Sequence, residues 1–146
     1  MDLSKIKPAE RVVEIKAPWD DGELIGLRIG LMSASDERMK EIKRAMIDKR
    51  QKYQARGKDF KALEIEENQN TLIFKAMTSW EWYNPTGAPG DEGYDVERHA
   101  EFEGEKSPKF NAATVLKVLS SIDWVKKQLI EELEEEKSFF EGYKSN

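Results

Sequence analysis

The sequence predicts an α+β fold that is mostly α, in which an N-terminal β-hairpin packs on three or four helices. Two short apolar segments near the start of the chain, the second strictly alternating, indicate paired strands. Beyond them the spacing of apolar residues changes to three and four, which is typical of helices. No internal repeat of 20 to 50 residues is visible, and 146 residues is a usual size for one unit. We therefore expect a single domain over residues 1–146.

The predicted hairpin covers residues 11–32. Its second strand places apolar side chains on one face and the others on the opposite face: Ile25, Leu27, Ile29 and Leu31 against Gly26, Arg28 and Gly30. Between the strands, Asp21-Gly22 supplies the positive backbone φ that a tight turn requires.

Two helices are expected next, at about 35–56 and 59–82. For the first, Ser33 or Ser35 is the predicted cap, and Gly57 is the predicted stop. The second ends in Trp80-Glu81-Trp82-Tyr83, and its apolar face has a gap between Glu66 and Asn70.

The last third of the chain begins with a loop at about 84–100, which is rich in proline and glycine and which we expect to be mobile. Helices follow at about 111–121, capped by Asn111, and at about 123–140.

Composition excludes several chemistries. The chain has no cysteine, which removes disulfides, thiolate metal sites and cysteine nucleophiles. His99 is its single histidine, and no phosphate-binding loop or metal-ligand spacing is present. We therefore expect no enzymatic activity, no cofactor and no metal. No apolar stretch reaches the length of about 20 residues that a membrane-spanning helix needs, so no membrane partner is expected.

Charge is divided unevenly along the chain. Residues 1–62 hold 15 basic and 11 acidic side chains, a balance of +4, while residues 63–146 hold 9 and 18, a balance of -9. Despite the basic first helix, a pI near 5.1 and the lack of a recognisable module argue against nucleic-acid binding. Either opposite faces of one domain neutralise each other, or copies associate through candidate faces formed by Lys43, Arg44 and Arg50 on one side and by Glu132, Glu135 and Glu136 on the other.

Aromatic residues suggest protein binding. Candidate partner-binding residues are Trp82, Tyr83, Phe139 and Phe140, because aromatic side chains are favoured interface anchors. The alternative is that these residues close the core. Trp80 is assigned to the core.

The order of motifs along nearly the whole chain resembles the tail assembly chaperones of long-tailed bacteriophages and prophages. The motifs are Asp2-Leu3-Ser4, Pro8-Ala9-Glu10-Arg11, Ile25-Gly26-Leu27, a basic helix, Trp80-Glu81-Trp82, Phe110-Asn111-Ala112-Ala113, Ile122-Asp123-Trp124-Val125-Lys126-Lys127-Gln128-Leu129 and Phe139-Phe140. The loop from Pro85 to Gly93 departs from the family pattern.

This resemblance implies a non-enzymatic helper in the cytoplasm of the bacterial host. It would bind the tape measure protein, keep its apolar helices from aggregating, help to recruit tail tube subunits, and be absent from the finished virion. The family has no catalytic residues to transfer. One alternative is a structural tail-completion or connector adaptor that stays in the virion, and another is a small inhibitory or nucleic-acid-associated phage protein.

Overall fold

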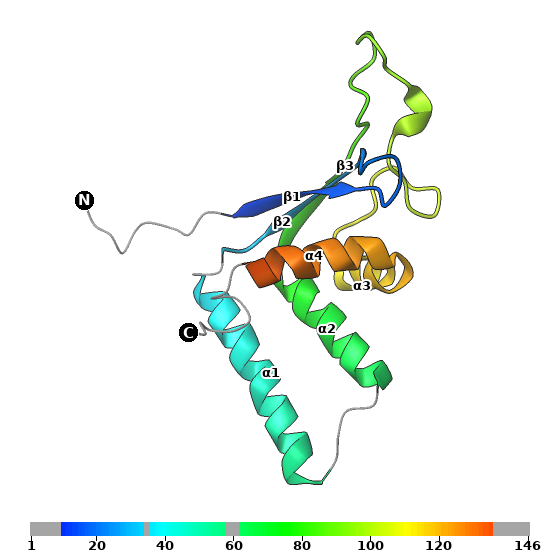
Figure 1. Ribbon diagram of the computed structural model, residues 1–146. Helices are drawn as coiled ribbons and strands as arrows, with labels where there is room; N and C mark the ends of the chain where they lie inside the picture. The colour runs from blue at the N-terminus through cyan, green and yellow to red at the C-terminus, as the bar shows by residue number, and fades with distance from the viewer. Residues whose placement is uncertain (1–9, 34–35, 58–61, 136–146) are drawn as a thin grey trace, which may run out of the picture.

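A computed structural model describes residues 10–33, 36–57 and 62–135, without the side chains of a few helical positions within these ranges. The elements run in the order β1 (Arg11–Lys16), β2 (Leu24–Leu31), α1 (Glu37–Ala55), α2 (Ala62–Ala76), β3 (Met77–Trp82), the short 3-10 helix η2 (Val96–Arg98), α3 (Ala112–Ser121) and α4 (Asp123–Glu135). In Figure 1 the sheet lies above α3 and α4, while α1 and α2 run downward away from it. The predicted α+β, mostly α class is confirmed.

The sheet is antiparallel with the strand order β1-β2-β3, so β2 is central. The turn between β1 and β2 is closed by a hydrogen bond from the Gly22 amide to the Trp19 carbonyl, 3.0 Å long. Its two central residues, Asp20 and Asp21, have φ of 47° and 57°. Positive φ at both positions gives a turn whose twist matches that of the strands, and aspartate tolerates this conformation. The predicted hairpin is thus confirmed, but Asp20-Asp21 rather than the predicted Asp21-Gly22 forms the centre of its turn.

One face of the sheet packs on α2, α3 and α4. The predicted alternation in β2 is confirmed, because Leu27, Ile29 and Leu31 are each at most 1% exposed. The helices contribute side chains that are equally buried, among them Ile73, Val115, Leu119, Val125, Leu129 and Leu133. This shared core positions α4 beside the sheet.

The helix predicted over 59–82 is wrong in its last third. The described helix α2 ends at Ala76, and the chain continues directly into β3 at Met77. Trp80 and Trp82 face the core from β3, whereas Ser79 and Glu81 are exposed, which is the two-residue period of a strand. Trp80 also fits the spacing of the preceding helix, and this ambiguity produced the wrong prediction.

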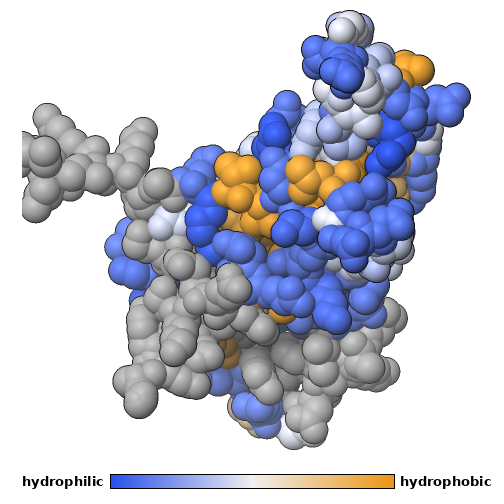
Figure 2. Space-filling model, turned by 45° about the horizontal axis from the view of Figure 1, so that its top comes forward, coloured by the Kyte–Doolittle hydropathy of each residue, from blue (hydrophilic) through white to orange (hydrophobic). Residues whose placement is uncertain are grey.

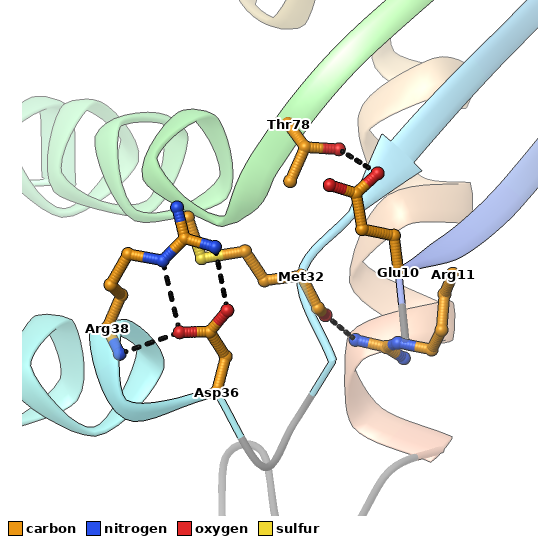
Figure 3. Close-up of polar contacts among 6 residues, drawn as sticks. All are labelled: Glu10, Arg11, Met32, Asp36, Arg38 and Thr78. Atoms are coloured by element: carbon orange, nitrogen blue, oxygen red, sulfur yellow. Dashed lines mark hydrogen bonds and ion pairs between the residues drawn. The ribbon is translucent and has the colours of Figure 1, made fainter. Parts of the chain in front are cut away.

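The start of α1 differs from the prediction as well. The cap is Asp36 rather than Ser33, because the Asp36 carboxylate accepts a 2.9 Å hydrogen bond from the Arg38 amide, and Ser35 lies outside the described residues. The Arg38 side chain donates to both oxygens of the same carboxylate (Figure 3). These hydrogen bonds hold the pKa of Asp36 below its usual value. The predicted stop is confirmed, since Gly57 has a φ of 70°.

Arg11 ties β1 to its surroundings. Its guanidinium donates to the carbonyl of Met32, just after β2, at 3.1 Å (Figure 3), and to the carbonyl of Glu132 in α4 at 3.2 Å. In the same view the Thr78 hydroxyl donates to the Glu10 carboxylate. Arg11 therefore fixes one end of β1 against α4.

Residues 84–100 project away from the sheet at the top of Figure 1. The two ends of this segment are joined: the Asn84 side chain donates to the Asp95 carbonyl at 2.8 Å, and the Asp95 amide donates to the Thr86 hydroxyl at 2.9 Å. An ion pair between Arg98 and Glu23 connects η2 to the hairpin. The mobility expected of this loop stays a prediction.

The helices predicted at 111–121 and 123–140 correspond to α3 and α4. The Asn111 side chain accepts a hydrogen bond from the Thr114 amide, as predicted for the cap of α3. Residues 136–140 lie outside the described part of the chain. No described helix has both the length and the apolar character needed to cross a lipid bilayer.

Candidate protein-interaction surface

The predicted aromatic anchors are not one exposed group. Trp82 is 9% exposed and packs edge-to-face on Trp80, so burial in the core is the correct alternative for it. Tyr83 is half-buried, and its hydroxyl donates to the Glu14 carboxylate. Phe139 and Phe140 lie outside the described residues.

The predicted charged faces are only partly described. On α1, Arg44 is exposed and Lys43 is half-buried. Glu132 on α4 forms an ion pair with Arg11 inside the chain, at 3.7 Å, so part of its charge is already compensated. The side chains of Arg50, Glu135 and Glu136 lie outside the described part. Association through these faces stays a prediction.

The structure reveals a groove between β1 and α4 that sequence reasoning did not anticipate. Its volume is about 420 Å³. One wall is the outer edge of β1 and the start of the turn, and the other is α4; the lining residues are Val13, Glu14, Lys16, Ala17, Gly22, Gln128, Glu131 and Glu132. Figure 2 shows hydrophobic residues gathered in the middle of the molecular face in view, with hydrophilic residues around them.

Gln128 bridges the two walls of the groove. Its side-chain oxygen accepts from the Lys16 amide at 2.8 Å, and its side-chain nitrogen donates to the Lys16 carbonyl at 2.7 Å. The same nitrogen donates to the Trp124 carbonyl one turn earlier in α4. Gln128 therefore connects the edge of the sheet to the helix with both of its polar atoms.

A pair of tryptophans, of which Trp19 is exposed and Trp124 is half-buried, lies beside this end of the groove. Trp19, in the hairpin turn, is 51% exposed and meets Trp124 edge-to-face with ring centroids 5.6 Å apart. Leu24, at the start of β2, is 40% exposed. A partly exposed tryptophan beside a groove has the properties of an interface anchor.

The sheet face that points away from the helices carries a row of charges. Arg28 in β2 forms ion pairs with Glu14 in β1 at 2.7 Å and with Glu81 in β3 at 2.6 Å, and its guanidinium lies 4.5 Å from the centre of the Tyr83 ring. Partial burial would raise the pKa of Glu14, but hydrogen bonds from Tyr83 and Arg28 outweigh it and lower that pKa. Burial and the neighbouring Glu14 raise the pKa of Tyr83.

One of the surface residues, Trp19, carried a signal in the sequence that was missed. Trp19 follows Pro18 and precedes Asp20-Asp21-Gly22, and a tryptophan inside a tight turn has little chance of complete burial. Gln128 carries no such signal, and its role becomes visible only once α4 is placed beside β1.

Within the described ranges, no group of three or more histidine, cysteine or carboxylate side chains is arranged to hold a metal ion. Comparisons with family models, with curated proteins and with solved structures found no match. The geometry of the groove and of the tryptophan pair is therefore the basis for a functional proposal.

Proposed function

We propose that the protein is an assembly chaperone for long bacteriophage tails, which binds the tape measure protein and helps to recruit tail tube subunits without catalysing a reaction. The order of sequence motifs supports the identity of the partners. The groove between β1 and α4, with Trp19 exposed beside it, supports a role in protein binding.

The observation that carries the proposal is the position of Trp19. Trp19 is 51% exposed, and Trp124 holds its ring in place from α4, so a partner that covers the ring removes apolar area from water. A ring held in this way loses little side-chain entropy when a client covers it.

Co-expression with the tape measure protein from the same genome tests the proposal. We expect the tape measure protein to be soluble and to co-purify with the wild-type chain. Trp19→Ala should weaken the complex about thirtyfold, the effect of losing an interface anchor worth about 2 kcal/mol.

Val96→Ala is the matched control, because Val96 is 57% exposed on η2 and does not line the groove. Equal binding by the wild type and both variants would contradict the role of Trp19. An insoluble client in every case, together with recovery of this chain from purified virions, would favour the structural adaptor instead.

A further inference from the structure

We propose that the groove between β1 and α4 is a strand-addition site, in which an extended, basic segment of a partner protein pairs its backbone with the outer edge of β1. The identity of the partner rests on the proposed function. The geometry of the site does not.

Strand β1 lies at an edge of the sheet. It pairs only with β2 in the described sheet, whereas β2 has a strand on each side. An edge strand offers unpaired amide and carbonyl groups to an incoming chain. Val12, in the first half of β1, is 62% exposed, so this part of the strand reaches solvent.

The side chain of Gln128 already forms hydrogen bonds with the backbone at the edge of β1. A primary amide has the same donor and acceptor as a peptide group, and Gln128 makes one hydrogen bond to the amide of Lys16 and one to its carbonyl. These are the two bonds that residues of a hydrogen-bonded antiparallel pair exchange. The edge at Lys16 therefore already accepts a peptide-like group from the groove side, and an added strand extends this pairing toward Val12.

The walls of the groove carry acidic charge. Of the three carboxylates that line it, Glu14 pairs with Arg28 and Glu132 pairs with Arg11, whereas Glu131 is exposed on α4 and faces solvent. Helix α4 as a whole carries five acidic and two basic residues. An extended segment that alternates lysine or arginine with aliphatic residues matches this wall, because its basic side chains reach Glu131 and the acidic helix while its backbone follows β1.

Synthetic peptides and the full-length protein provide the test. The probe is a short peptide in which lysine alternates with valine. Two controls have the same length: one alternates glutamate with valine, and the other keeps the lysines but carries prolines, which cannot donate backbone hydrogen bonds. Binding is measured by fluorescence anisotropy, and amide hydrogen exchange locates the peptide on the protein.

We expect the lysine-valine peptide alone to bind, and to slow amide exchange in β1 by about tenfold or more while exchange in β3 is unchanged. Glu131→Lys, which alters an exposed side chain on the α4 wall, should weaken this binding about fivefold and improve binding of the glutamate-valine peptide.

Equal binding of the proline-containing peptide would overturn strand addition, since only charge attraction would then remain. Protection of β3, or a dimer formed through β1 in the absence of peptide, would also overturn the proposal. Peptide binding without solubilisation of the tape measure protein would contradict the proposed function and support strand addition at the groove. Solubilisation without peptide binding would support the proposed function and contradict strand addition.

Discussion

Gly26 allows β2 and the end of β3 to approach each other closely. It has a φ of 94°, and a Cβ at this position would lie 2.1 Å from the Tyr83 carbonyl oxygen. The Gly26 carbonyl accepts a 2.7 Å hydrogen bond from the Tyr83 amide. This contact positions Tyr83 beside Arg28 and Glu14, so a single glycine sets the geometry of the charged row.

Gly26→Ala should therefore lower the free energy of unfolding by about 3 kcal/mol or more, from backbone strain together with the clash. Gly93→Ala is the control, because Gly93 has a similar φ of 82° but open space around it, and should lose only about 1 kcal/mol. Denaturant unfolding of the two variants measures the difference. Equal losses of unfolding free energy in the two variants would show that the close approach to Tyr83 does not contribute to the cost of Gly26→Ala.

The register of the three strands is fixed by residues on both of their faces. On the face away from the helices, Glu14, Arg28 and Glu81 lie directly opposite one another in neighbouring strands. A shift by one residue would bring these charges into the core and expose the leucines and isoleucines of β2. The ion pairs and the apolar face thus specify the same alignment.

The charged row predicts a distinct pH dependence. Because the pKa of Glu14 is below its usual 4.5, its contribution to stability is complete above that pH and is lost as the pH falls through the lowered value. Because the pKa of Tyr83 is above its usual 10, its contribution is present below pH 10 and is lost as the pH rises through the raised value. Glu14→Gln should bring the pKa of Tyr83 back toward 10.

Ultraviolet titration follows the formation of tyrosinate, and subtracting the curve of the Tyr83→Phe variant isolates the titration of Tyr83. Glu81→Gln is the matched control, because it removes a carboxylate that contacts Arg28 and not Tyr83. A Tyr83 pKa that moves equally in both variants would mean that Glu14 is not the cause of the shift.

Elements in which apolar or capping residues recur at the regular positions of a helix or strand could be predicted from the sequence. Elements that depend on tertiary contacts could not. The alternation in β2, the cap of α3 at Asn111 and the stop at Gly57 each follow from local chemistry. By contrast, β3 was not predicted, because the position of Trp80 fits the spacing of a helix as well as that of a strand. The groove depends on where the core places α4, which no local pattern encodes.

Basic and acidic residues are concentrated on different helices of the molecule. Helix α1 carries seven basic and three acidic residues and extends away from the sheet, whereas α4 carries an excess of acidic residues (Figure 1). Such a distribution favours contacts between the α1 of one copy and the α4 of another. Repeated weak contacts of this kind suit a protein that coats a long client.

We therefore expect association at low ionic strength that weakens as salt shortens the range of charge attraction. Arg44→Glu on α1 should weaken association about fivefold, whereas Lys109→Glu, an equal change of charge at an exposed position outside α1, should have less effect. Sedimentation velocity over a range of protein concentrations measures both. A monomer at every salt concentration, or equal effects of the two variants, would contradict this arrangement.

The joined ends of residues 84–100 separate the outer part of this loop from the rest of the domain. Because Asn84, Thr86 and Asp95 close the segment at its base, the residues beyond them can change in number at little cost, about 0.6 kcal/mol for each doubling of loop length. Glu92 lies in this outer part, and its side chain is exposed to solvent. The loop is thus a natural attachment point for a fluorophore or an affinity tag that leaves the sheet and its groove undisturbed.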